Sequence, residues 1–240
     1  VWALGWLMNT LKVKICGITR CEDAVLAVEE GADYLGFVLA PSVRQISLES
    51  AGVIISRLHD RFGDALPRMV AVVVQPDSGL LDRLADSGLF DVLQIHKPAE
   101  PFPTYCRIPW CLSVPVPAQR DAGIVRYCNE DIDELAFSGT AGLVLCDAAV
   151  QGVCGGSGIR VDSSAARFVR DRARRHGFDF ILAGGLRPES VRVALTEIEP
   201  DGVDVASGLE DRPGMKSAEK IHAFMTAVRR WESDRLNDMI

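Results

Sequence analysis

The feature that most constrains the fold of this chain is an alternation, repeated eight times, of short apolar runs with longer amphipathic runs. The short runs are rich in β-branched residues and mostly apolar on both faces, as is typical of parallel strands covered by helices. The expected strands are Leu11–Ile15, Asp33–Leu39, Met69–Val74, Val92–Ile95, Trp110–Val114, Gly142–Cys146, Phe178–Leu182 and Gly202–Val205. Eight strand–helix units in a chain of 240 residues predict an α/β fold, a (β/α)8 or TIM barrel. A doubly wound open sheet is the alternative.

Runs with helical periodicity separate these strands. The clear ones are Cys21–Gly31, Leu48–Arg61, Asp77–Ser87, Ser163–His176, Pro188–Glu197 and Ser217–Arg235. Two other connections, 97–106 and 118–137, give weaker patterns. Because no long linker or low-complexity tract divides the chain, we expect a single barrel domain over residues 11–235. Residues 1–10 are expected to be an N-terminal extension. It has no signal-peptide pattern, and Met8 is a candidate natural start.

Composition narrows the class of partner. The chain carries 26 Lys and Arg against 33 Asp and Glu, a formal net charge of −7, which argues against nucleic acid and anionic membranes. Seven cysteines, an odd number without a CxxC pair, indicate a reduced cytoplasmic protein rather than a disulfide framework or zinc site. The four histidines lack HxH and HxxxH spacing, so we expect no histidine-built metal site. A small anionic ligand remains compatible, because backbone donors can bind phosphate in an acidic protein.

Three reactive or charged side chains stand at the carboxyl ends of expected strands, where barrels of this kind carry their chemistry. Cys16, after the first strand, is either a catalytic thiol or an ordinary buried cysteine. Asp147, after the sixth strand, is either a helix cap or a general acid whose proton is retained by burial. Arg44, in the loop after the second strand, is either a solvated residue or a ligand for a substrate carboxylate.

Glycine-containing loops follow the seventh and eighth expected strands, the usual place for phosphate in a TIM barrel. Gly184 and Gly185 in the first loop, with Ser207 and Gly208 in the second, offer backbone amides and a hydroxyl to an anion. The alternative is that these glycines only serve tight turns.

A third glycine-rich loop and a histidine complete the set of candidates. The loop is either a flexible connection or part of the substrate site, and it consists of Gly155, Gly156, Ser157 and Gly158. His96 ends the fourth expected strand and is a further candidate for the substrate site.

Six segments of the chain together resemble one enzyme family. They are KICGITR at 14–20, GADYLGFVLAPSVRQIS at 31–47, LQIH at 93–96, CGGSGIRVD at 154–162, LAGGLRPESV at 182–191 and GVDVASGLED at 202–211. Because these segments occur in this order, the chain resembles phosphoribosylanthranilate isomerase, an enzyme of tryptophan biosynthesis. The resemblance implies a (β/α)8 barrel. It also implies an Amadori rearrangement of N-(5-phosphoribosyl)anthranilate to 1-(2-carboxyphenylamino)-1-deoxyribulose 5-phosphate.

The resemblance also implies the roles of individual residues. Cys16 takes the general-base position, Asp147 the general-acid position, and Arg44 the position that holds the anthranilate carboxylate. The loops at Gly184-Gly185 and Ser207-Gly208 match the phosphate site. No metal or organic cofactor is implied, because the nitrogen of the substrate itself is the electron sink.

The base and the acid make opposite demands on their surroundings. A free thiol titrates near pH 8.5, so Cys16 needs stabilisation of its thiolate, for which backbone amides and Lys14 are candidates. Asp147 must instead keep a proton that a solvated aspartate loses.

Some segments depart from the family pattern. Val43 stands where the family usually has proline, Lys97 replaces a glycine, and Arg160-Val161-Asp162 replaces an aromatic-containing FDW. These changes concern the substrate loops and leave Cys16 and Asp147 intact. The alternatives are another sugar-phosphate isomerase or synthase on a phosphate-binding barrel, and a barrel that binds a phosphorylated ligand without turnover. The expected partner is a small-molecule substrate, and the expected state is a monomer or homodimer.

Overall fold

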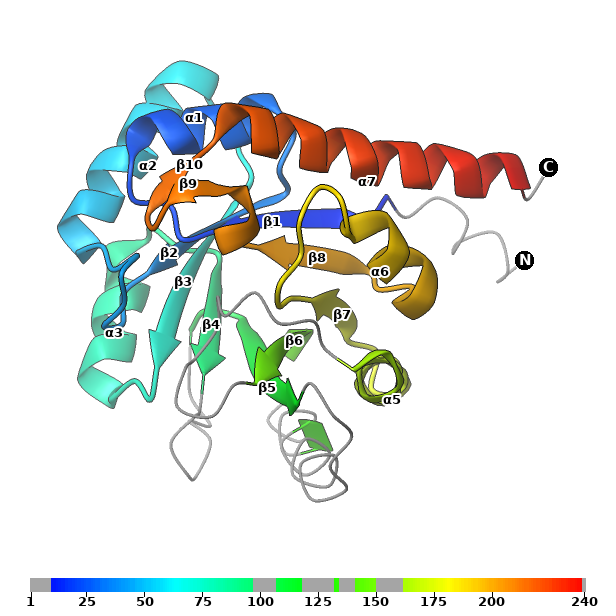
Figure 1. Cartoon of the computed structure of the whole chain (residues 1–240). Helices are drawn as coiled ribbons and strands as arrows, with labels where there is room; N and C mark the ends of the chain where they lie inside the picture. The colour runs from blue at the N-terminus through cyan, green and yellow to red at the C-terminus, as the bar shows by residue number, and fades with distance from the viewer. Residues whose placement is uncertain (1–9, 97–106, 118–131, 134–140, 150–161, 239–240) are drawn as a thin grey trace.

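Eight parallel strands close into a barrel in chain order, with helices around it (Figure 1). The computed structural model describes residues 10–96, 107–117, 132–133, 141–149 and 162–238. The strands are β1 (Lys12–Cys16), β2 (Tyr34–Val38), β3 (Arg68–Val74), β4 (Val92–His96), β5 (Trp110–Pro117), β6 (Ala141–Ala149), β7 (Asp179–Leu182) and β8 (Gly202–Val205). Pairing of β8 with β1, which sets Lys14 opposite Asp204, closes the barrel. The expected (β/α)8 fold is confirmed, and the open-sheet alternative is wrong.

The helices fall where the periodicity predicts them, with ends that shift by up to three residues. They are α1 (Cys21–Glu29), α2 (Leu48–Phe62), α3 (Ser78–Ser87), α5 (Ser163–Arg175), α6 (Val191–Ile198) and α7 (Ala218–Asp238). Side-chain caps fix three of the starts: Ser47, Asp77 and Asp162 each accept a hydrogen bond from the backbone N–H three residues on, which satisfies an otherwise unpaired helix donor.

Several expected segments lie outside the described residues. They are the weak connection 97–106, nearly all of 118–137, the Gly155–Gly158 loop, and the N-terminal extension apart from Thr10. Within the described residues, no helix is long and apolar enough to cross a membrane.

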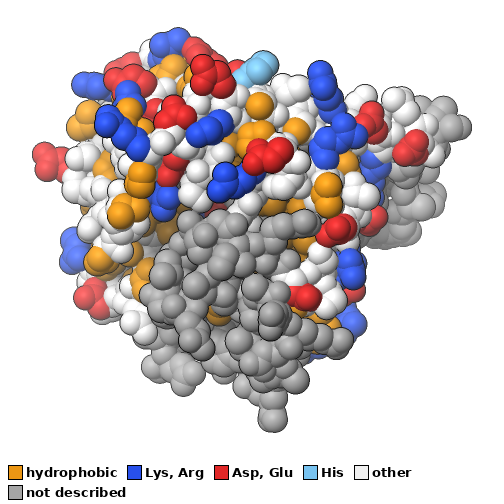
Figure 2. Space-filling view, in the orientation of Figure 1, with side chains coloured by type: hydrophobic (Ala, Val, Ile, Leu, Met, Phe, Trp, Pro, Cys, Tyr) orange, Lys and Arg blue, Asp and Glu red, His pale blue; other side chains and the backbone are white. Residues whose placement is uncertain are grey.

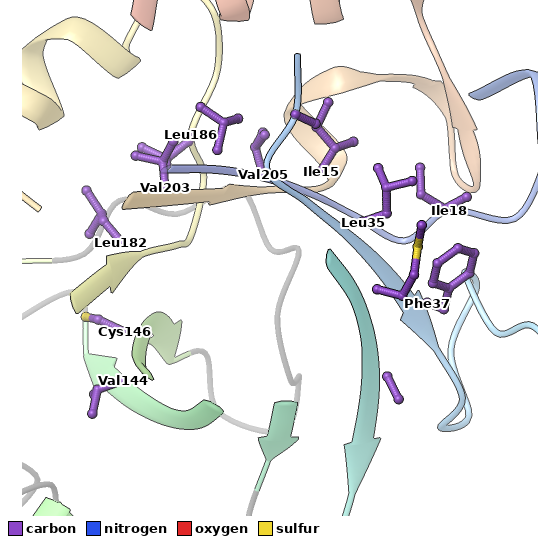
Figure 3. Close-up of a cluster of buried hydrophobic side chains, with 14 of the residues drawn as sticks. Ile15, Ile18, Leu35, Phe37, Val144, Cys146, Leu182, Leu186, Val203 and Val205 are labelled. Atoms are coloured by element: carbon purple, nitrogen blue, oxygen red, sulfur yellow. The ribbon is translucent and has the colours of Figure 1, made fainter. Parts of the chain in front are cut away.

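Alternate residues of each strand face the helices or the barrel interior, as the period of two requires. Figure 3 shows outward-facing side chains such as Ile15, Phe37 and Val203, which belong to the core between barrel and helices. The inward-facing apolar residues form a second core of Cys16, Tyr34, Val70, Val72, Val92, Cys111, Leu145, Ile181 and Ala183. The alternation sends Lys14 and Cys16 of β1 into the barrel, while Ile15 between them points out.

A small hairpin that the sequence did not predict follows β8. It comprises β9 (Glu210–Arg212) and β10 (Met215–Lys216), which pair antiparallel, and it lies beside α1 and β1 in Figure 1. Thr19 Oγ1 donates a hydrogen bond of 2.6 Å to the carbonyl of Gly214. The Lys216 amide donates one of 3.1 Å to Asp23 Oδ2. The hairpin is therefore bound to the segment that leaves β1.

The described surface carries charges of both signs. Acidic and basic side chains are interspersed on the face shown in Figure 2 rather than gathered into blocks.

Candidate active site

One cavity opens at the carboxyl ends of the barrel strands and gathers every described candidate residue. Its lining includes Cys16, Arg44, His96, Asp147, Gly184, Gly185, Ser207 and Gly208. One detail of the expectation is wrong: Asp147 lies within β6 rather than after it, because Ala148 and Ala149 continue the pairing with β5. Asp147 still points to the cavity, two residues after the inward-facing Leu145.

Cys16 sits at the floor of this cavity, with 7% of its surface exposed. The facing residue on β2 is Gly36, and a Cβ atom there would lie 2.7 Å from the Cys16 sulfur. The thiol therefore occupies space that only a glycine leaves open. Burial raises the pKa of Cys16, and Asp204 adds to this effect, while Lys14 and Lys216 oppose it. The resting thiol is consequently protonated at neutral pH, and the two lysines moderate the cost of its ionisation.

A chain of hydrogen bonds crosses the barrel interior beneath Cys16. Lys14 Nζ donates to Asp204 Oδ1 at 2.9 Å and to Gln94 Oε1 at 2.7 Å. Gln94 Nε2 lies 2.8 Å from His96 Nε2, and His96 reaches the cavity. Burial disfavours the charged form of Lys14, but attraction to Asp204, the hydrogen bond to it and the charges of Cys16 and Cys111 together outweigh burial, so the pKa of Lys14 is raised.

Arg44 is held at the rim by a second cluster of charges. Its Nε and Nη2 donate to the two carboxylate oxygens of Glu210 at 2.7 and 2.8 Å. Lys216 Nζ donates to Glu210 Oε1 at 3.0 Å and to the carbonyls of Cys16 and Ala206 at 2.6 and 3.0 Å. Burial works against the Glu210 carboxylate, yet Arg44 and Lys216 hold its pKa below the usual value. The guanidinium therefore has a fixed orientation, and its outer edge can serve a second carboxylate.

The two candidate phosphate loops contact each other through their backbones. A Cβ atom on Gly208 would lie 1.9 Å from the carbonyl oxygen of Leu186, so only glycine permits this approach. Gly184 and Gly185 have φ angles of +91° and +64°, a turn that favours glycine. The loops after β7 and β8 thus form one wall of the cavity, built from backbone groups that can approach an anion closely.

Three charged residues of the site escaped the sequence reasoning. Asp204 stands inside the apolar strand β8. The alternation of inward- and outward-facing residues along this strand was the signal that could have identified it. Glu210 and Lys216 flank a Pro-Gly dipeptide at 213–214, a turn signal that could have indicated the hairpin. Within the described residues, no group of three or more His, Cys, Asp or Glu is placed to hold a metal ion.

Comparison with known proteins agrees with this geometry. The family model described as N-(5'-phosphoribosyl)anthranilate (PRA) isomerase matches residues 13–227. The isomerase of Nitrosomonas europaea is 35% identical over 94% of this chain and 98% of its own length. The crystal structure of the Thermotoga maritima isomerase superposes with a TM-score of 0.74 at 30% identity, covering 92% of this chain and all of that one.

A further solved isomerase structure holds reduced 1-(o-carboxyphenylamino)-1-deoxyribulose 5-phosphate. It is 30% identical, with a TM-score of 0.71, and covers 92% of this chain and all of its own. The family model spans most of the sequence, and the relatives match it nearly end to end. The chain therefore belongs to the N-(5'-phosphoribosyl)anthranilate isomerase family.

Proposed function

We propose that Cys16 and Asp147 are the general base and general acid with which this isomerase rearranges N-(5'-phosphoribosyl)anthranilate. The observation that carries the proposal is the composition of the cavity, which is lined by a thiol, a carboxyl group, an arginine and two amide-rich loops. A substrate with a carboxylate at one end and a phosphate at the other matches this set of groups.

The first chemical step is opening of the furanose ring. Asp147, in its protonated form, donates its proton to the ring oxygen, and the C–O bond breaks to give a protonated Schiff base. Asp147 lines the cavity from an inward-facing position of β6. The positive charge formed on the substrate nitrogen then acidifies the hydrogen on the sugar C2.

The second step is removal of that hydrogen by Cys16 as thiolate. The electron pair of the C–H bond becomes the C1=C2 double bond, and the π pair of the C=N bond moves to the nitrogen. The resulting enolamine tautomerises to the ketone. Because burial raises the pKa of Cys16, the thiol must first lose its own proton to solvent. Activity controlled by this step therefore rises with pH through the neutral range. Each unit of pKa increase costs about 1.4 kcal/mol of thiolate stability.

Binding would use the groups on either side of the reacting carbons. Arg44 is orientated by Glu210, so we assign its outer edge to the anthranilate carboxylate. The backbone amides at Gly184-Gly185 and Gly208, with the Ser207 hydroxyl, are assigned to the phosphate. His96 lines the same cavity and is assigned to the substrate site. The Gly155–Gly158 loop remains a prediction, because it lies outside the described residues.

The assignment of acid and base is tested with Cys16→Ser and Asp147→Asn. Each variant is expected to lose at least about 100-fold in kcat, the usual contribution of a positioned acid or base. The assay follows the fluorescence of phosphoribosylanthranilate. Cys21→Ser is the matched control, because Cys21 is also a free thiol near the end of β1 but does not line the cavity. Wild-type turnover by Cys16→Ser would show that the thiol is not the base.

We further infer that residues 11–235 form a single (β/α)8 barrel catalytic domain. We also infer that it works in the cytoplasm on a small molecule, as a monomer or homodimer without nucleic acid. The net charge of −7 and the free thiols of Cys16, Cys21, Cys111 and Cys146 support this. Analytical ultracentrifugation of the purified chain would decide between the two oligomeric states.

A further inference from the structure

The buried ion pair between Lys14 and Asp204 is the feature that the proposed acid–base chemistry leaves unexplained. The two residues are register partners on β1 and β8, at the seam where the barrel closes. Their side chains are only 6% and 10% exposed. TIM-barrel interiors are usually filled by branched apolar side chains, and such residues are often as stable as a buried ion pair of similar volume. Stability alone therefore does not account for this pair.

The position of the pair relative to Cys16 suggests another role. Lys14 and Cys16 are two residues apart on β1 and point to the same side of it, so both side chains enter the barrel interior. The positive charge of Lys14 favours the thiolate, whereas the negative charge of Asp204 disfavours it. One ion pair thus exerts two opposing effects on one sulfur atom.

Other groups face Cys16 from the surrounding elements, and they complete its electrostatic environment. They are Lys216 of β10, Arg44 of the loop after β2, Cys111 of β5, and the cavity-lining Asp147 of β6 with Gln94 and His96 of β4. Lys216 and Arg44 are bound to Glu210 at the rim. Among the described residues, Lys14 and Asp204 form the buried ion pair in the barrel interior of which one member favours the Cys16 thiolate and the other disfavours it.

We propose that Lys14 is a positioning residue that stabilises the Cys16 thiolate, and that the negative charge of Asp204 opposes this effect and limits it. This inference rests on the proposed role of Cys16 as the base. The pair itself keeps its net charge of zero throughout: the proton taken from the substrate stays on sulfur. The arrangement leaves a base that is reactive enough to remove the proton and still basic enough to hold it.

The test measures the reactivity of Cys16 directly, without substrate. Iodoacetamide reacts with the thiolate and releases iodide, so its rate on a given cysteine follows the thiolate fraction. Modification of the peptide that contains Cys16 is followed by mass spectrometry over a range of pH. The variants are Lys14→Met, Asp204→Asn and the double variant. Lys12→Met is the matched control: Lys12 is also on β1 and paired with an aspartate, Asp33, but its side chain is 40% exposed and it is not among the groups that shift the pKa of Cys16.

The expected order of alkylation rates at neutral pH is Asp204→Asn above wild type and Lys14→Met below it. Removal of the Lys14 charge is expected to slow the reaction about tenfold, because a unit charge close to a buried thiol shifts its ionisation by on the order of one unit or more. The double variant returns to within about threefold of wild type, and Lys12→Met matches wild type.

The opposite signs separate an electrostatic role from a merely structural one, since loss of packing alone would change both single variants in the same direction. Rates that move together, or a Lys14→Met rate equal to wild type, overturn the proposal. If Lys14→Met does not fold, the double variant and Asp204→Asn still give the comparison, because an Asp204→Asn rate at or below wild type overturns it. Turnover by Cys16→Ser would reject the base assignment while leaving the alkylation order unaffected.

Discussion

Two buried lysines lie close to Cys16, and their surroundings shift the pKa values of their side chains in opposite directions. Burial disfavours the charged form of both. Attraction to Asp204 nevertheless raises the pKa of Lys14, whereas the pKa of Lys216 is lowered by burial and by the neighbouring Arg44. The difference is one of stoichiometry. Asp204 serves a single cation, while Glu210 is shared between two.

The two clusters consequently have different net charges. The interior pair of Lys14 and Asp204 sums to zero, whereas the rim cluster of Arg44, Lys216 and Glu210 carries one excess positive charge when all are ionised. A neutral pair inside the barrel can adjust the thiol without attracting ions into the core. An excess cation at the rim attracts the anionic substrate that the proposed function requires. The position of each cluster thus fits the task assigned to it.

The largest effect is expected from Glu210→Gln, which leaves both rim cations without their carboxylate. We expect a loss of about 3 kcal/mol in the free energy of unfolding, because breaking a buried ion pair leaves uncompensated charge. We also expect KM to rise about tenfold or more, because Arg44 loses its orientation. Urea unfolding and steady-state kinetics measure the two effects.

Asp211→Asn is the matched control for this variant. Asp211 is the next residue along the same strand and pairs with Lys220 at the surface, where its side chain is 62% exposed. An unchanged KM in Glu210→Gln would mean that Arg44 does not need the rim cluster for its function.

An intermediate effect is expected from Gly36→Ala, which perturbs the interior cluster through the thiol above it. The new Cβ atom would lie 2.7 Å from the Cys16 sulfur and 3.1 Å from its Cα. We expect about 1–3 kcal/mol of destabilisation from overpacking, and a fall in kcat larger than the change in KM because the thiol is displaced.

Gly142→Ala is its control, since Gly142 is also a strand glycine but a Cβ atom there has open space. Equal kcat and KM values for the two alanine variants would mean either that Cys16 takes no part in the reaction or that β2 shifts to accommodate the new methyl group.

The smallest expected effect is a loss of stability at high pH that is linked to the burial of Cys111 in the barrel interior. Burial raises the pKa of Cys111 to about 12, so the unfolded chain loses this proton before the folded chain does. The stability linked to Cys111 is therefore fully present below the unfolded pKa, near 8.5, and is lost as pH rises from there towards 12.

We expect wild type to lose roughly 1 kcal/mol more than Cys111→Ala between about pH 7 and 9.5. Urea unfolding of the two proteins at both pH values tests this. Parallel losses would show that the barrel interior is wetter than its burial indicates.

The sequence predicted the barrel well because its signal is local. Each expected strand, such as Gly202–Val205, combines a short apolar run with a following turn, and closure of the barrel follows from having eight such units. The ends of the helices and strands have a weaker signal in the sequence. Pro188 predicts an early start for α6, whereas residues 188–190 form a turn. Pattern alone does not distinguish a first helical turn from an isolated one.

The site was predictable only in part, for a physical reason. Cys16, Asp147 and Arg44 could be proposed because they follow strands or match a family segment. The Glu210 contact with Arg44 joins residues 166 positions apart, and no periodicity carries such information. The raised pKa of Cys16 likewise depends on burial and on neighbours from distant strands, which only the folded arrangement brings together.

The side chain of Lys216 also sets a condition on when the protein can begin to work. Its ammonium donates hydrogen bonds to the carbonyl of Cys16, at the end of β1, and to that of Ala206, just after β8. A ribosome makes the thiol 200 positions before this lysine. The growing chain therefore contains the Cys16 thiol long before it contains Lys216. Translation must pass Lys216 before these contacts can form, so a chain that terminates earlier contains the thiol without them.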